Sequence, residues 1–253
     1  MVRFIFALFM FVSVTIVQAE EIVLGMSKNE VAITATFDGS NILVFGAIKR
    51  DRPIQDTPLH VIVSIVGPSK PVIVRRKEQR FGIWVNKDMV EIDAAPSFYA
   101  IATTGSFQQV LSETEDLRHK VSINRAIKSV GAPMNVSNRQ SFSDALIRIQ
   151  RNKGLYQSLE RTVDLDQQTL FRTMIEMPAN LTEGQYRTRI FLTRNGKVLN
   201  QFETSIKVRK VGLERFLFNL SRNNPLVYGL MSIAIAIFAG WLASAFFQVI
   251  RSR

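Results

Sequence analysis

The chain after its N-terminal leader alternates between short apolar runs and polar turns. Runs of roughly four to eight apolar or alternating positions, bounded by turn residues, predict β-strands. Asp38-Gly39-Ser40, between the first two runs, is typical of a hairpin turn. The predicted strands before residue 105 are EVAITATF (30–37), NILVFGAIK (41–49), LHVIVSIVG (59–67), KPVIVRRK (70–77), RFGIWVNK (80–87) and SFYAIATT (97–104).

The period changes between residues 105 and 156, where we expect a helical insertion. Phe107, Val110 and Leu111 fall on one helical face. Ser112 followed by Glu115 forms a capping box, so a helix is expected to restart there. A clearer helix is predicted over residues 141–153, because its apolar positions recur at helical spacing before Gly154.

Strand patterns return after residue 160 and end in a strong hairpin signal at Asn195-Gly196. The spacing of Leu181, Gly184 and Tyr186 resembles the tyrosine corner of Greek-key sandwiches. The alternative is an ordinary turn before a strand. We therefore predict a mainly β fold, an immunoglobulin-like β-sandwich over residues 20–211 with the helical insertion. The sequence leaves open whether this is one sandwich or two small β-domains.

Residues 1–19 have the pattern of a cleavable signal peptide. Arg3 precedes an uncharged apolar core, and Val17 and Ala19 supply small residues ahead of Glu20. A buried N-terminal strand or an uncleaved anchor is the alternative.

Residues 225–250 predict a transmembrane helix, because Leu226 to Ile250 holds no charged residue and exceeds the length that a bilayer requires. Arg251 and Arg253, in the tail 251–253, favour a cytoplasmic C-terminus. With the signal peptide, this predicts a single-pass protein of the bacterial inner membrane with a periplasmic N-terminal domain.

Residues 212–224 predict a juxtamembrane amphipathic helix. Its apolar stripe consists of Leu213, Phe216, Leu217 and Leu220. This stripe is expected to contact lipid at the membrane interface. The alternative is that the segment packs on the β-rich domain.

The predicted span carries small residues at every fourth position. Ser232, Ala236, Gly240 and Ser244 would give a flat helix face that another helix can approach closely. This face predicts a membrane-protein partner or a homo-oligomer. The alternative is the ordinary abundance of small residues in membrane helices.

The composition limits the ligands and reactions that the chain can support. The formal net charge is +11, which alone would suggest nucleic acid or anionic lipid, but the predicted topology argues against nucleic acid. The chain has no cysteine and only His60 and His119, so we predict no metal site. The carboxylates of SETED (112–116) are expected to be a solvated helix start. No catalytic motif is present, and we expect neither enzymatic activity nor a cofactor.

Four basic residues stand directly before an apolar run at 81–85. We interpret this stretch first as a charged hairpin that blocks edge pairing. The sharper hypothesis is a docking or small-anion site with Arg75, Arg76 and Arg80 as donors. Trp84 is expected in the core, because the run around it is otherwise apolar; the alternative is an exposed anchor.

Several sequence blocks resemble the alphaproteobacterial putative transmembrane protein family, and the resemblance covers nearly the whole mature chain. It implies no catalytic residue, and it associates such proteins with sulfite-exporter-like permeases. The blocks are VAITATFDGSNILVFGAIKR, RRKEQRFGIWVN, DAAPSFYAIAT, LSETEDLR, SVGAPMN, MPANLTEGQY and VRKVGLERF.

The sequence thus predicts a non-enzymatic accessory protein of the inner membrane that binds or stabilises a membrane partner, with a permease as the expected class. The alternative is a periplasmic anion-binding module that serves a sulfur-oxyanion exporter.

Overall fold

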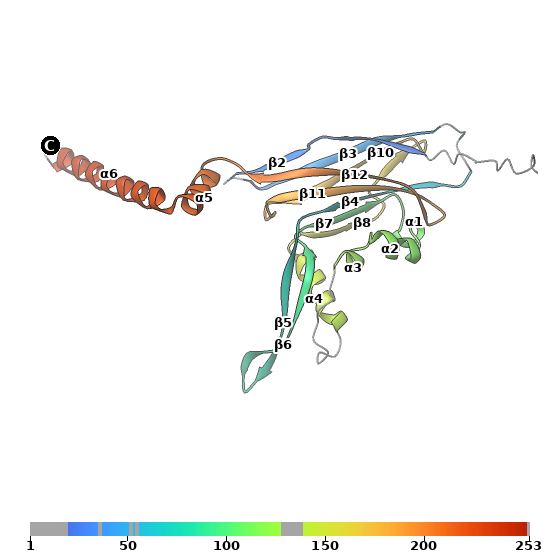
Figure 1. Ribbon diagram of the computed structural model, residues 1–253, viewed down its shortest axis with the longest axis horizontal. Helices are drawn as coiled ribbons and strands as arrows, with labels where there is room; N and C mark the ends of the chain where they lie inside the picture. Colours follow the sequence, from blue (N-terminus) through green and yellow to red (C-terminus); the bar gives the residue numbers. More distant parts are fainter. Residues whose placement is uncertain (1–19, 35–36, 51–52, 54–55, 128–138, 252–253) are drawn as a thin grey trace, which may run out of the picture.

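The computed structural model describes residues 20–34, 37–50, 53, 56–127 and 139–251. Figure 1 shows three parts: a β-domain formed by the described residues between 20 and 211, a long hairpin arm that leaves it, and a C-terminal helical segment at one end. Because 1–19 lie outside the described residues, the predicted signal peptide has no structural counterpart here.

Two sheets form the β-domain. The first is antiparallel, and its strands, in spatial order, are β1 (Glu21–Met26), β3 (Gly39–Lys49), β10 (Leu170–Pro178) and β9 (Asp164–Asp166). Strand β10 alternates strictly between exposed and buried positions, with Phe171, Ile175 and Met177 facing the core. This alternation follows from the two-residue period of a strand with one buried face.

The second sheet has six strands. In spatial order they are β2 (Glu30–Ile33), β12 (Lys197–Lys210), β11 (Gly184–Arg194), β4 (Leu59–Val66), β7 (Tyr99–Thr103) and β8 (Tyr156–Leu159). Strand β4 is buried along almost its whole length, because the first sheet lies on one face and helices lie on the other. Its run of Val and Ile is therefore continuous rather than alternating.

The predicted hairpin around Asp38-Gly39-Ser40 is wrong. Strand β2 leaves the first sheet and pairs in parallel with β12, while β3 pairs with β1 and β10. The local turn signal is real, since Gly39 has φ +127°. A turn residue fixes a change of direction, but the choice of partner strand depends on contacts distant in sequence.

In its described residues, the connection between β7 and β8 contains four helices. They are α1 (Phe107–Val110), α2 (Glu113–His119), α3 (Ile123–Ala126) and α4 (Arg139–Asn152). Strands β7 and β8 run parallel, so this connection is a crossover. The predicted restart at Ser112 is confirmed, because its Oγ accepts a hydrogen bond from the Glu115 backbone N–H at 3.4 Å.

The expectation that SETED is a solvated helix start is wrong for two of its carboxylates. Glu115 and Asp116 are buried. One carboxylate oxygen of Asp116 accepts hydrogen bonds from the backbone N–H groups of Val121 and Ser122, at 3.0 and 2.6 Å. Glu115 accepts from the backbone N–H of Val198 in β12 at 3.3 Å. Both acids therefore satisfy buried backbone donors.

The tyrosine corner is confirmed. The Tyr186 hydroxyl donates to the Thr182 carbonyl oxygen at 2.7 Å, four residues upstream and just before β11. The hairpin at Asn195-Gly196 also forms, and both residues have positive φ, at 51° and 74°. These backbone angles are those of a two-residue hairpin turn of the primed type.

The predicted fold class, mainly β with a C-terminal apolar helix, is confirmed. The orders β1-β3-β10-β9 and β12-β11-β4-β7 follow the A-B-E-D and G-F-C-C′ orders of immunoglobulin-like sandwiches. The parallel pairing of β7 and β8 departs from an all-antiparallel sandwich. The immunoglobulin-like assignment stays a prediction that the strand order supports.

The arm consists of strands β5 (Ser69–Arg80) and β6 (Ile83–Pro96), joined by a two-residue turn. At the other end of the chain, α5 (Leu213–Asn223) leads into α6 (Pro225–Arg251). Figure 1 shows the arm below the β-domain and α6 extending to the left, away from both sheets.

Candidate membrane and partner-binding sites

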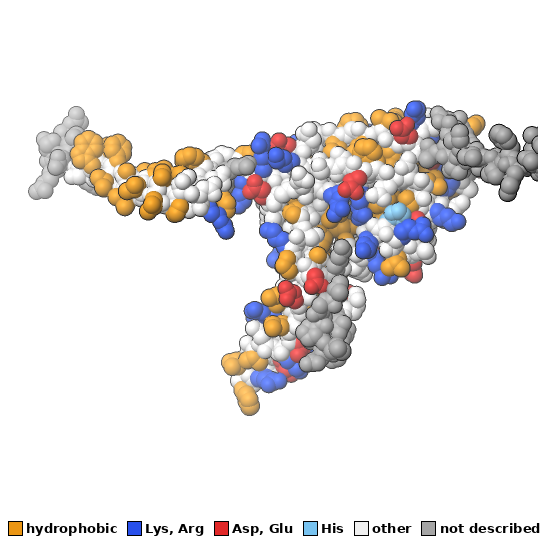
Figure 2. Space-filling model, viewed as in Figure 1, with side chains coloured by type: hydrophobic (Ala, Val, Ile, Leu, Met, Phe, Trp, Pro, Cys, Tyr) orange, Lys and Arg blue, Asp and Glu red, His pale blue; other side chains and the backbone are white. Residues whose placement is uncertain are grey.

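Helix α6 is long and apolar enough to cross a membrane. This stretch is Pro225–Ser244, and no described part of the protein buries it. Figure 2 shows hydrophobic side chains along its length. A helix that is apolar on every side and unburied fits a bilayer rather than water.

The small residues predicted to form a contact face lie on α6 and are exposed. They are Ser232, Ala236, Gly240 and Ser244. A Cβ atom placed on Gly240 would meet no described atom within 4 Å. The Ser232 hydroxyl donates to the Tyr228 carbonyl oxygen at 2.9 Å, within the helix. This small-residue face is therefore open to another helix.

Helix α5 packs against α6 and carries the predicted interface residues. Phe216 is exposed, while Leu217 and Leu220 are half-buried. Leu213 begins the helix, and its side chain lies outside the described set. Arg222 stacks over the Phe218 ring, with its guanidinium carbon 5.7 Å from the ring centroid. An exposed apolar stripe with a nearby arginine fits the headgroup boundary of a bilayer.

The structure brings Arg75, Arg76 and Arg80 onto the same strand, β5, but not into one cluster. Arg76 binds Asp88 across the arm, with its Nη2 2.6 Å from the carboxylate. Arg80 lies 3.5 Å from Glu78, which also pairs with Lys87 at 3.0 Å. The hydrogen bond from Lys87 is the largest cause that lowers the pKa of Glu78. Two of the three arginines are thus already paired.

A basic groove of about 660 Å³ lies between the arm and α4. Arg75, Arg76, Lys77 and Arg148 line it, against one acid, Asp144. The guanidinium of Arg76 lies over the Phe142 ring of α4, 5.1 Å from its centroid. The sequence alone does not connect Arg148 with this surface, because α4 meets the arm only in the folded chain.

The expected core position of Trp84 is wrong. Its side chain is 66% exposed, and Ile83 beside it is 64% exposed. Val90 and Ile92, farther along β6, are buried where the arm meets α4. The apolar run at 81–85 lies instead at the free end of the arm, where neither strand face is covered.

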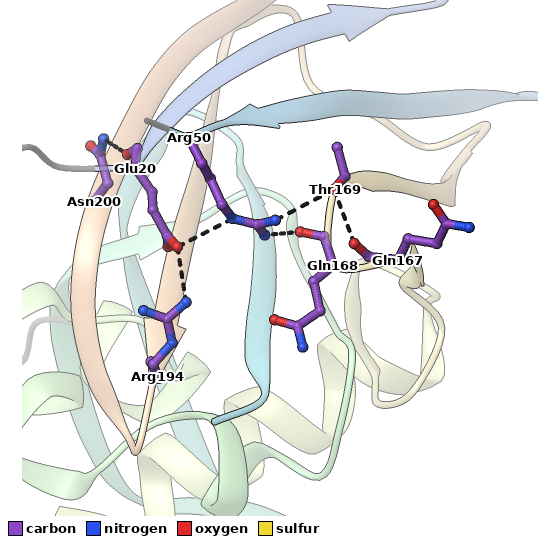
Figure 3. Close-up of polar contacts among 7 residues, drawn as sticks. All are labelled: Glu20, Arg50, Gln167, Gln168, Thr169, Arg194 and Asn200. Atoms are coloured by element: carbon purple, nitrogen blue, oxygen red, sulfur yellow. Dashed lines mark hydrogen bonds and ion pairs between the residues drawn. The ribbon is translucent and has the colours of Figure 1, made fainter. Parts of the chain in front are cut away.

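A largely covered ionic cluster joins the two sheets at the start of β1 (Figure 3). One carboxylate oxygen of Glu20 accepts from Arg50 at 3.2 Å and from Arg194 at 2.9 Å. The side chains of Arg50 and Arg194 are 9% and 10% exposed. Arg50 also donates to the Gln168 carbonyl oxygen, and the Asn200 side-chain amide donates to the Glu20 carbonyl oxygen. No motif in the sequence marked this cluster.

The two histidines lie on different elements. His60 Nδ1 lies 3.1 Å from the Thr104 hydroxyl, and burial lowers the pKa of His60. His119 is partly covered: it packs edge-on against Phe191 and lies 3.5 Å from Glu115. Among the described residues, no three His, Asp or Glu side chains gather as a metal site would require.

These features define a membrane protein with one candidate span among its described residues and a mainly β domain on the N-terminal side of that span. The chain matches the family model described as "Putative transmembrane protein (Alph_Pro_TM)" over residues 21–249, and it belongs to this family. The match covers the β-domain, the arm, α5 and nearly all of α6, and it confirms the resemblance noted in the sequence. A comparison with curated proteins found no match.

Proposed function

We propose that this protein is a non-enzymatic accessory protein that binds and stabilises a membrane-protein partner. The β-domain would lie in the periplasm and α6 would cross the inner membrane, as the leader pattern and the basic tail predict. A permease is the class of partner to test first, following the family resemblance.

One observation carries this proposal. Helix α6 presents an open small-residue face, with Gly240 free of any described neighbour. In a bilayer, lipid chains are as apolar as the helix, so association depends on close packing of backbones at small residues. A tethered domain with such a face is suited to holding a second membrane protein close to the β-domain.

The experiment is affinity purification from mildly solubilised membranes after crosslinking in cells. We expect a stoichiometric membrane protein to copurify with the native chain and to be lost with Gly240→Leu. The matched control is Ala234→Leu, which adds comparable bulk about 120° around the helix from Gly240. Loss of the partner in both variants, or in neither, would argue against recognition by this face. Recovery of the chain alone would favour a homo-oligomer or a monomeric tether.

The basic groove favours a second candidate, an anion-binding module for a sulfur-oxyanion exporter. Four basic side chains face one acid there, and guanidinium groups bind sulfate-like oxyanions through paired N–H donors. Against it, Arg76 and Arg80 are already engaged by carboxylates.

Thermal unfolding in the presence of sulfite, sulfate or phosphate separates the two candidates. A ligand that binds only the folded state raises the midpoint. An anion module should lose that rise in the Arg75→Ala, Arg76→Ala, Arg80→Ala triple variant, whereas an accessory protein should show no rise at all. Gly240→Leu should leave any anion effect unchanged.

A further inference from the structure

We infer that the tip of the β5–β6 arm, residues Arg80–Trp84, is a second membrane contact that inserts into the headgroup region beside the α6 span. This inference does not depend on the accessory role proposed above, because it concerns lipid rather than a protein partner.

The tip is an exposed apolar surface. Phe81 is fully exposed, and Ile83 and Trp84 each expose about two thirds of their surface. Met89 adds a further exposed side chain on the same strand. Figure 2 shows hydrophobic side chains at the free end of the arm, with basic side chains next to them. Contiguous exposed apolar surface on a soluble domain marks an interaction site.

The geometry of the turn does not favour a phenylalanine at position 81. Phe81 and Gly82 have φ values of 50° and 82°, nearly those of Asn195 and Gly196 in the β11–β12 hairpin. That turn form favours Asn-Gly, and a bulky residue at the first position is an outlier. The chain therefore places a phenylalanine against its backbone preference and without any packing contact.

The charge of the arm selects an anionic surface. Residues 75–89 hold five basic and two acidic side chains, for a net charge of +3. Lys77, Arg80 and Lys87 are exposed close to the tip. Basic side chains near an anionic leaflet strengthen membrane association, and Trp is enriched at the headgroup level of bilayers. An aromatic tip flanked by Lys and Arg combines both features.

The arm leaves the β-domain near the end from which α5 and α6 extend. Pro68, just before β5, would lie 2.9 Å from a Cβ on Gly184, so the two residues are in close contact. Gly184 pairs with Val208, close to the end of β12, and α5 begins soon after at Leu213. The base of the arm and the start of α5 therefore lie close to each other.

The arm is long enough to act at a distance from the span. Twelve residues of β5 extend roughly 36–40 Å at the usual rise per residue of a strand. Figure 1 shows the arm running across the direction of α6, which is along the surface of a membrane that α6 crosses. A tip that reached the bilayer would contact it to one side of the span and would restrict rotation of the β-domain.

Fluorescence of the full-length chain in lipid vesicles tests the inference. The chain has two tryptophans, so Trp241→Phe leaves Trp84 as the only one. In vesicles of phosphatidylcholine with phosphatidylglycerol, we expect Trp84 emission to shift to shorter wavelength and to lose intensity when the acyl chains are brominated. Replacing phosphatidylglycerol by phosphatidylcholine should weaken both effects.

A probe elsewhere on the molecule serves as the control. Leu117 is an exposed residue of α2, near the β11–β12 turn at the end of β12 remote from α5. Leu117→Trp, in a chain that also carries Trp84→Phe and Trp241→Phe, should not be quenched by brominated lipid.

The variant Phe81→Asn gives the sharpest test, because it restores the favoured turn pair. We expect equal or higher thermal stability together with weaker quenching of Trp84. If Trp84 in the native tip is not quenched by brominated lipid, or if Phe81→Asn leaves quenching unchanged, the inference is overturned. Unquenched Trp84 that crosslinks to a second protein in cells would assign the tip to a protein partner instead.

Discussion

The carboxylate of Glu20 lies 2.9 Å from the guanidinium of Arg194, across the gap between the two sheets. Glu20 precedes β1 of the first sheet, and Arg194 ends β11 of the second. Arg50, at the end of β3, binds the same carboxylate oxygen. The first described residue of the chain therefore joins strand ends from both layers.

Glu20→Gln is expected to destabilise the β-domain by about 3 kcal/mol, because it leaves two buried guanidinium groups without their counter-charge. For a domain of this size, that corresponds to a fall in the thermal midpoint of roughly 6–12 °C. Differential scanning calorimetry of the purified chain measures it. The neighbouring Glu21→Gln is the control. Its carboxylate is exposed and lies 3.6 Å from Lys49, so a change below about 1 kcal/mol is expected. Equal effects at both positions would contradict a role for the ionic cluster.

We predict that the mature chain begins at Glu20. Asn200 holds the Glu20 backbone, and ten further residues of β12 separate it from Lys210, about 33 Å along the strand. A leader retained in the same membrane would keep residue 20 close to the bilayer and away from this position. Intact-mass measurement of the protein from membranes should show the loss of residues 1–19, and a chain that begins at Met1 would contradict the prediction.

Acidification should weaken the β-domain through His60. Burial lowers the pKa of His60 from its ordinary value of 6.5, so below that pH the unfolded chain binds more protons than the folded one. The contribution of neutral His60 is present above pH 6.5 and is lost as the pH falls toward its folded-state pKa. Urea unfolding at about pH 7.5 and about pH 5.5 should show a smaller difference in His60→Gln than in the native chain. An unchanged difference would assign the pH dependence to other groups.

Removal of the Tyr186 hydroxyl should cost about 1–2 kcal/mol, since Tyr186→Phe leaves the Thr182 carbonyl oxygen without this donor. Burial raises the pKa of Tyr186, so the hydroxyl remains a donor at neutral pH. Chemical denaturation measures the loss. Tyr228→Phe, in α6, removes a hydroxyl outside the β-domain and should leave its unfolding midpoint in place. A Tyr186→Phe chain as stable as the native one would contradict a structural role for the corner.

Local patterns predicted the elements whose signals are contained within a few residues. The Asn195-Gly196 turn, the Tyr186 corner and the Ser112 cap each depend on near neighbours, and each forms as predicted. The partner of β2 could not be found in this way. Its pairing with β12 joins residues near position 32 to residues near position 209, and no local signal specifies that choice.

The environment of the apolar run at 81–85 was misjudged for a related reason. Composition indicates that Trp84 can be buried, but only the two-residue turn at Phe81-Gly82 places it at a free tip. Gly82 is the one residue of this pair that is typical of a turn. The phenylalanine before it is not, so the sequence does not predict a turn at this position. The sequence does not reveal the Glu20 cluster, because its members are separated by up to 180 residues in the chain.

The connection between β12 and α5 has a mechanical consequence. Only Val211 and Gly212 separate the last strand from the helices, so a pull on α6 acts along β12. Strand β12 lies between β2 and β11, and the hydrogen bonds to both neighbours run across the strand direction. Such a load stretches the bonds of both ladders together instead of opening them one after another. Gly212, at φ +93° with open space around it, is the point at which the β-domain can rotate relative to the helices. The anchor thus resists extraction along its axis, and the connection itself lets the β-domain turn until the arm tip meets the bilayer.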